Sequence, residues 1–257
     1  MKEIFNAKRF GKLFYKHTTE HYKSYLMSLV VLLGIMVLGG GFLVYMVNVP
    51  VDEGFQAFLF MSMLLLSGTI FTSTVFADLG DKKKAIAWLT LPATHFEKYM
   101  VAWIYSAVIF LGVYTASFYA VILVVINLQH YPGHYPQVFN LLEGKVAEVY
   151  LLYFFLHGIA LWGAIFFTRM HFVKTAFAFL ICFAALVMFN KIFLGQLLGR
   201  VVEAAPPFGS ARIYEGADYN DIGIAAKQQN TFMVAVLLLL ALLFWAAAFF
   251  RLKEKQA

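Results

Sequence analysis

The chain has 257 residues, of which 62% are hydrophobic and only 13% are charged. Soluble domains carry about 25% charged residues, so this composition excludes an ordinary soluble fold and predicts a membrane protein. The formal net charge is +6, but the cationic residues lie at the ends of apolar runs and not in one patch, so we expect no nucleic-acid partner. The single cysteine, Cys182, excludes a disulfide within the chain.

Six apolar runs are long enough to cross about 30 Å of hydrocarbon as α-helices. We expect them at residues 24–47 and 55–77 (within 24–77), at 99–127, 148–168 and 175–194 (within 99–194), and at 231–250. The remaining segments are the N-terminus (1–23), a basic connection (78–98), a large connection (195–230) and a short tail (251–257). The sequence therefore predicts an all-α membrane protein with six transmembrane helices, in one transmembrane domain over 1–257.

The Lys and Arg residues are distributed unevenly between the two sides of the predicted membrane. Fifteen of the twenty lie in the N-terminal segment, in the second and fourth connections and in the tail, and five lie in the other connections. Connections rich in Lys and Arg remain in the cytoplasm. We therefore expect both termini, and the connection over 78–98, on the cytoplasmic side.

Residues 2–21 show the pattern of an amphipathic helix that lies on the membrane surface. One side of the helical wheel carries Ala7, Phe10, Leu13, Phe14 and His17, and the other side carries Lys2, Lys8, Arg9, Lys12 and Lys16. Phe5 does not fit this pattern. Such a helix buries its apolar face at the headgroups and offers its cations to anionic lipid or to a protein partner. The alternative is a basic flank that only sets the topology.

The second span carries small and hydroxyl residues at helical spacing. They are Ser67, Gly68, Thr69, Thr72 and Ser73. Small residues let helices approach closely, and hydroxyl groups hydrogen-bond across helices. This face therefore lines a substrate path or a dimer seam, or it packs within one subunit.

No Asp, Glu, Lys or Arg lies inside any predicted span, since Glu148 and Lys191 fall at span ends. Ion-coupled transporters usually need such groups in the membrane, so a driving force is expected to come from outside the spans. His157 is the one titratable group near the middle of the membrane. It is either a proton or metal relay or, as we favour, a histidine hydrogen-bonded to a neighbouring helix.

Motifs for catalysis or metal binding are absent from the sequence. There is no G-x-x-x-x-G-K-[ST] phosphate loop, no H-E-x-x-H and no C-x-x-C. His130 and His134 flank Tyr-Pro-Gly, but Pro132 and Gly133 break the helix that would align two metal ligands. We therefore predict no catalytic residues, no metal site and no cofactor on this chain.

The connection over 78–98 is more elaborate than a loop that only sets topology. Asp81 suits the start of a short helix because of the helix dipole, and Lys82, Lys83 and Lys84 follow it. The same helix carries the apolar Ile86, Trp88 and Leu89, and Pro92 ends it. Thr94 and Glu97 then form a T-x-x-E capping box that begins the third span.

The phrase Leu91-Pro92-Ala93-Thr94-His95-Phe96-Glu97 resembles the "LP-[VA]-[ST]-x-x-E" phrase before the third span of ATP-binding-cassette (ABC) type-2 permeases. That family also has an N-terminal interfacial helix, six spans with both termini inside, and its largest outer connection between spans five and six. The resemblance covers nearly the whole chain. His95 departs from it, because many relatives have a basic residue at that position.

The resemblance implies a membrane-embedded permease subunit of an exporter in the bacterial cytoplasmic (inner) membrane, which moves a substrate outward. It would work with a second permease subunit, the same or similar, and with an ABC ATPase subunit that holds ATP and Mg. The connection would be a coupling helix, with Trp88, Ile86 and Leu89 in a cleft of the ATPase and the three lysines at its rim. Two alternatives remain. One is a scaffold or accessory subunit without a transport path, and the other is a membrane-embedded hydrolase or transferase.

The predicted topology is testable by cysteine labelling in a Cys182→Ala background. Single cysteines at Asn140 and Gly216 should react with an impermeant thiol reagent added outside intact cells, because the charge distribution places both positions outside. A cysteine at Lys83 should react only after permeabilisation. Labelling of position 83 in intact cells would reverse the orientation.

Overall fold

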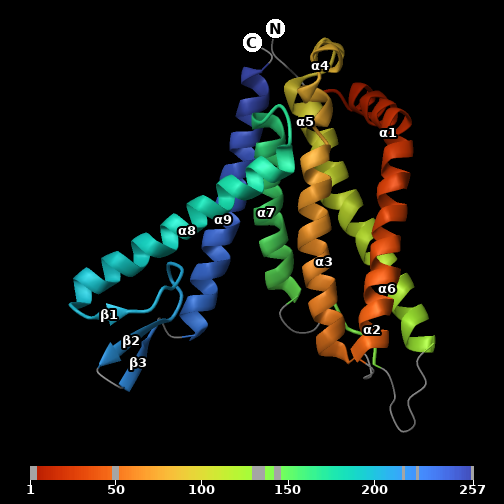
Figure 1. Cartoon of the computed structure of the whole chain (residues 1–257). Helices are drawn as coiled ribbons and strands as arrows, with labels where there is room; N and C mark the ends of the chain where they lie inside the picture. The colour runs from red at the N-terminus through yellow and green to blue at the C-terminus, as the bar shows by residue number, and fades with distance from the viewer. Residues whose placement is uncertain are drawn as a thin grey trace.

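The computed structural model describes residues 5–47, 52–128, 137–141, 146–215, 218–223 and 226–255. Six helices in these ranges are long and apolar enough to cross a membrane, which supports a multi-pass, predominantly helical membrane protein (Figure 1). They are Ala7–Gly40, Glu53–Thr74, His95–Leu128, Val146–Phe166, His171–Leu198 and Gln229–Glu254.

Two of these long helices contain a π-helical segment. The first consists of α1 (Ala7–Ile35), η1 (Met36–Gly40) and α2 (Gly41–Val47), and the third of α5 (His95–Trp103), η3 (Ile104–Ile109) and α6 (Phe110–Leu128). The others are α3 (Glu53–Thr74), α7 (Val146–Phe166), α8 (His171–Leu198) and α9 (Ala226–Glu254). Between α3 and α5 lie the 3₁₀ turn η2 (Ala77–Gly80) and the short helix α4 (Lys82–Leu89).

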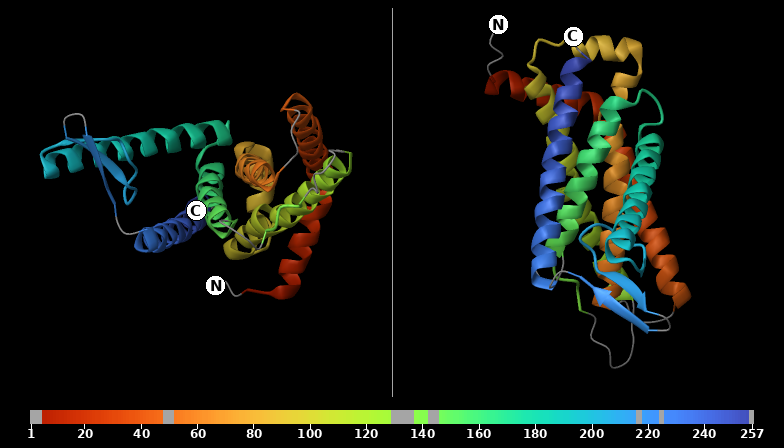
Figure 2. Two further views of the ribbon diagram at one scale, coloured as in Figure 1. Left: turned by 90° about the horizontal axis from the view of Figure 1, so that it is seen from below. Right: turned by 90° about the vertical axis from the view of Figure 1, so that its left-hand side faces the viewer.

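Helix α7 is the centre of the bundle, between α3, α8 and α9 (Figures 1 and 2). Half of its most apolar stretch is buried, compared with 6% for α8. Glycines allow these close approaches, because a Cβ at Gly68 would overlap the ring of Tyr153 and one at Gly163 would overlap Thr175. Close contact through small residues is the usual way in which membrane helices associate.

Side-chain hydrogen bonds also join the helices. The Tyr153 hydroxyl donates to the Ser106 carbonyl over 2.8 Å, and the Tyr114 hydroxyl donates to the Phe60 carbonyl over 2.7 Å. These groups are buried, so they would lose free energy without a partner. The bonds therefore define how the third span lies against α3 and α7.

A three-stranded antiparallel sheet follows α8, in the segment over 195–230 that was predicted only as a large connection. Its strands are β1 (Val201–Val202), β2 (Ala211–Glu215) and β3 (Asp218–Ile222), in the order β1-β2-β3. Val202 and Ile213 pair in the register and are buried together. The expectation of an all-α chain is therefore incomplete, because a short apolar cluster gives these strands a core of their own.

Helix α8 leaves the bundle and carries this sheet at its far end (Figure 1). The helix continues to Leu198, so Lys191, which was expected at the end of a span, lies inside it. The neighbouring Asn190 donates a hydrogen bond of 2.9 Å to the Ala205 carbonyl. This bond ties the helix to the chain that leads into the sheet.

The N-terminal segment is not a separate helix. Residues from Ala7 onward belong to α1, which begins across the end of the bundle near α4 and then turns along it (Figure 2). The side chain of Asn6 caps this helix by accepting from the amides of Lys8 and Arg9. Phe5, which did not fit the wheel, lies before the helix with its ring 5.6 Å from that of Phe10.

The close approach of α3 and α7 leads to a stability prediction. Gly68→Ala should lower the free energy of unfolding by about 1–3 kcal/mol, because the new methyl group overlaps Tyr153. The matched control is Gly112→Ala in α6, where a Cβ meets nothing within 4 Å. Thermal unfolding in detergent measures both, and equal melting temperatures would contradict this account of the interface.

Candidate functional site

The segment between α3 and α6 folds as a short helix, a turn and a capped helix. Asp81 caps α4 by accepting from the amides of Lys83 and Lys84 at 2.9 and 3.3 Å. The helix ends at Leu89, and Pro92 lies in the turn before α5. Thr94 and Glu97 form a complete capping box. The local order that the sequence predicts is therefore present.

The carboxylate of Glu97 does more than complete the capping box. Its Oε2 accepts from the Thr94 amide at 3.0 Å and from Arg9 Nε at 2.6 Å. Its Oε1 accepts from Arg9 Nη2 at 2.8 Å and from the Asn6 amide at 2.8 Å. Glu97 is fully buried. One carboxylate thus joins the start of α1 to the start of the third span.

This contact has the geometry of a strong ion pair. Two parallel N–H···O bonds between a guanidinium and a carboxylate combine charge with a defined orientation. The Arg9 side chain is 38% exposed, so its charge remains partly hydrated while the carboxylate is buried. Such an arrangement limits the desolvation cost that a fully buried pair carries.

Asp78, in η2, is a second polar centre of the site. Its Oδ1 lies 3.1 Å from the Nζ atom of Lys84, and its Oδ2 lies 3.5 Å from Nε2 of His21 in α1. The hydrogen bond and the charge of Asp78 raise the pKa of Lys84 above its ordinary value. Asp78 therefore lies between α4 and α1 and supplements the Glu97 contact.

The indole of Trp88 packs inside this chain, which differs from the expected role as an exposed anchor. Its ring lies 5.8 Å from that of Phe76 in an edge-to-face arrangement, and the Nζ atom of Lys98 lies 5.4 Å from its centre. The side chain is half-buried at the edge of a cluster around Phe76 and Leu79. The residue thus fixes the inner face of α4.

The opposite face of α4 is open. Lys83, Ile86, Ala87 and Thr90 are exposed, and their spacing of three or four residues places them on one side of the helix. Ile86 is 63% exposed. The side chains of Lys82 and Leu89 lie outside the described part of the chain. A protein partner at α4 would therefore meet Ile86 and its lysine neighbours first.

The predicted membrane-surface residues of α1 divide into two groups. Lys8 and Lys12 are exposed, and the Nζ atom of Lys16 lies 3.5 Å from Oε1 of Glu20. Phe10 and Phe14 are half-buried, and the ring of Phe14 lies 4.9 Å from that of Tyr105 in η3. The apolar side of this segment therefore packs at least partly on protein, and Arg9 belongs to the ion pair.

The same end of the molecule also connects to the later helices. The Tyr99 hydroxyl in α5 donates to the Trp245 carbonyl in α9 over 2.9 Å. A Cβ at Gly80 would overlap the backbone carbonyl of Thr168, between α7 and α8. A displacement of η2 or α5 would therefore also displace parts of α1, α7 and α9.

The residues singled out in the second span separate into a packed group and a cavity-lining residue. Gly68, Thr72 and Ser73 are buried, and the Thr72 hydroxyl donates to the Gly68 carbonyl over 2.7 Å. The Thr69 hydroxyl likewise donates within α3, to the Leu65 carbonyl. Ser67 lines a cavity next to α1. Gly68, on the packed side, thus lies against Tyr153 of the same chain.

His157 is hydrogen-bonded through both ring nitrogens. Trp245 Nε1 of α9 donates to Nδ1 over 3.0 Å, and Nε2 lies 2.9 Å from the Ser106 hydroxyl of η3. A ring that accepts at Nδ1 is neutral, so Nε2 carries the proton. This is the arrangement that the favoured interpretation predicts, a histidine that joins neighbouring helices. His130 and His134 lie outside the described residues.

Two polar features were not predicted from the sequence. Nε2 of His17 lies 2.6 Å from the Tyr25 hydroxyl, and the hydroxyls of Thr18 and Tyr105 are hydrogen-bonded. Gln56 is fully buried, and its side chain bonds the backbone at positions 137 and 139. In the sequence, two patterns could have indicated these features. They are the i, i+4 spacing of His17 and His21 and the amide side chain of Gln56 within an apolar run.

Comparisons with protein-family models, with curated proteins and with solved structures found no match to this chain.

The ion pair leads to a prediction with a matched control. Arg9→Ala should destabilise the protein by about 1–3 kcal/mol, because a buried carboxylate loses two of its donors. The melting temperature should fall by roughly 5 °C. Lys12→Ala removes an exposed cation from the same helix and should leave the melting temperature within about 1 °C of wild type. Equal effects of the two changes would contradict the structural role of Arg9.

Proposed function

We propose that this chain is the membrane-spanning permease subunit of a bacterial ABC exporter, in which a separate ATPase subunit hydrolyses ATP. The observation that carries the proposal is the Glu97–Arg9 contact in the L-P-A-T-H-F-E phrase. It joins the third span to α1, and Asp78 beside it contacts Lys84 of α4 and His21 of α1, so a force applied at α4 can be transmitted to the spans.

The chemistry of ATP belongs to the partner in this proposal. The chain has no phosphate loop, and the predicted spans contain no carboxylate that would couple transport to an ion gradient. Nucleotide and Mg therefore bind to the ATPase. A second permease subunit, the same or similar, completes the membrane part, and the assembly resides in the bacterial inner membrane.

The open face of α4 is the surface that we assign to the ATPase. Ile86 offers an exposed apolar side chain, with Lys83 and Lys84 beside it. Apolar anchors surrounded by charged rims are typical of protein interfaces. Trp88, Thr94 and Glu97 act from the inner side, by holding α4 and α5 in place.

The proposal is tested by purifying the tagged chain in mild detergent from the cells that make it. A protein with a G-x-x-x-x-G-K-[ST] loop should co-purify in stoichiometric amount, and the complex should hydrolyse ATP. Ile86→Asp should lower the ATPase recovered by about tenfold or more, since a charge then replaces the apolar anchor. The matched control is Val201→Asp, which changes an exposed aliphatic residue of β1.

The outcomes separate the proposal from its alternatives. Absence of any such ATPase from the wild-type complex would contradict the permease assignment. An ATPase that binds but hydrolyses ATP at the same rate with and without this chain would instead indicate a scaffold. Full recovery of the ATPase with Ile86→Asp would show that α4 is not the docking surface.

A further inference from the structure

A large cavity lies between α1, α3 and the η3–α6 part of the third span. Its volume of about 670 Å³ lies within the range of about 300–1,000 Å³ of small-molecule sites. Leu26, Val31 and Ile70 line it and are themselves 63%, 50% and 41% exposed. The cavity is thus open on the side of the bundle.

The lining of the cavity changes from polar to apolar along its length. At the end near α4 it carries hydroxyl groups from the early part of α1, from the last residue of α3 and from η3. These are Thr18, Tyr22, Ser24, Tyr25, Thr74 and Tyr105. Farther along it is lined by Leu32 and Ile35 of α1 and by Ile109, Phe110 and Val113 of the third span. The hydroxyls of Ser28 and Ser67, which also line this part, donate to backbone carbonyls of their own helices. A ligand that matches this lining has one polar end and one apolar end.

The polar end is an organised structure with unused hydrogen-bonding groups. The rings of Tyr25 and Tyr105 stack with centres 5.3 Å apart, and their hydroxyls bond His17 and Thr18. By contrast, the hydroxyls of Tyr22 and Ser24 make no hydrogen bond to any described residue. They remain available to the head of a ligand.

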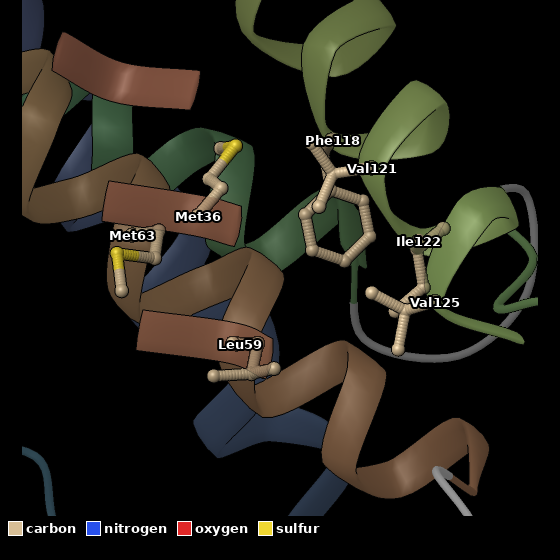
Figure 3. Close-up of a pocket in the computed structure, with 8 residues that line it drawn as sticks. Met36, Leu59, Met63, Phe118, Val121, Ile122 and Val125 are labelled. Carbon is tan, nitrogen blue, oxygen red and sulfur yellow. The ribbon is translucent and has the colours of Figure 1, made fainter. Parts of the chain in front are cut away.

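The cavity is bounded at its apolar end by the core of the bundle. Beyond Ile35, Met36 of η1, Leu59 of α3 and Phe118 of α6 belong to one buried cluster and line a second, smaller pocket (Figure 3). The residual space there is only about 30 Å³ and has an almost entirely apolar lining. A ligand tail therefore ends near Met36.

The shape of the cavity indicates the kind of occupant. Along α1 the cavity extends from Thr18 to Ile35, which is about 25 Å at the helical rise of 1.5 Å per residue. A cavity of about 670 Å³ that extends over this length is elongated, and an elongated cavity with hydroxyl groups at one end and aliphatic side chains along the rest suits one extended amphiphile.

We propose that this cavity is a binding site for a single-chain amphiphile, with its polar head at Tyr22 and Ser24 and its acyl chain against Leu32, Ile35 and Val113. The ligand enters sideways, from the membrane leaflet on the side of α4. The site requires only this chain, so it stands independently of the ATPase partner.

The experiment uses the purified full chain and lysophosphatidylcholine that carries a photoreactive diazirine at the end of its acyl chain. After irradiation, mass spectrometry should place the label near Leu32–Ile35 and Ile109–Val113. The labelling should saturate and be displaced by excess unlabelled lysophosphatidylcholine. Labelling that never saturates and is spread over all lipid-facing helices would show ordinary surrounding lipid only and would overturn the proposal.

A matched pair of variants locates the site. Val113→Trp fills the apolar part of the cavity and should weaken saturable labelling by about tenfold or more. Val108→Trp makes the same change at an exposed valine of the same span that does not line the cavity, and should leave labelling unchanged. Equal losses in both variants would overturn the assignment. The melting temperatures of both variants show whether they fold. If Val113→Trp does not fold, the saturation of labelling in the wild-type protein decides whether the site exists.

A photoreactive amino acid at Leu26 tests for a second copy as occupant. Irradiation with the unlabelled lipid present should give an adduct with the mass of one lipid. A crosslinked dimer of the chain in its place would overturn the proposal.

Discussion

The buried carboxylate of Glu97 is the constraint on which the α4 end of the molecule depends. An ionised carboxylate is costly to bury unless hydrogen bonds and an opposite charge compensate for lost hydration. Its four donors come from Asn6, Arg9 and Thr94. Because residues 6–9 are far from residue 94 in sequence, meeting this requirement brings the start of α1 beside the start of α5 and directs α1 across the end of the bundle.

The rest of the bundle follows the rules of helix association in an apolar medium. Lipid chains offer no hydrophobic advantage to contact between helices, so small residues and hydrogen bonds determine the neighbours. Helix α7 has both, since Tyr153 fits against Gly68 and bonds the third span, and His157 bonds η3 and α9. Helix α8 has few such contacts beyond Thr175 near its start, and it diverges from the bundle (Figure 1).

The proposed docking surface and the proposed amphiphile site share structural parts. Tyr105 lines the cavity and contacts Phe14 of α1, and α1 is tied to α5 by the ion pair of Arg9 with Glu97. A movement of α5 relative to α1 would thus change the width of the polar end of the cavity. In a transporter, this proximity would link the state of the partner at α4 to the occupancy of a site that opens to the bilayer.

The sequence by itself determined the class of protein, the six apolar helices and the local signals at their ends. Apolar runs of about 20 residues and a T-x-x-E box act within a few turns of chain, so Thr94 with Glu97 and Asp81 at the start of α4 were predictable. The inward position of Trp88 was not predictable, because it depends on Phe76 and Lys98 arriving on the same side of α4.

Only the tertiary structure decided which distant groups meet. The partner of Glu97 is Arg9, which the pattern of α1 assigned to the membrane surface. The small β-sheet packs its apolar cluster against Leu194 of α8, which continues to Leu198. The hydroxyls and aliphatic residues of the cavity come from three separate spans. Periodicity reports which face of a helix is apolar, whereas the identity of its neighbours follows from packing and from the pairing of buried charge.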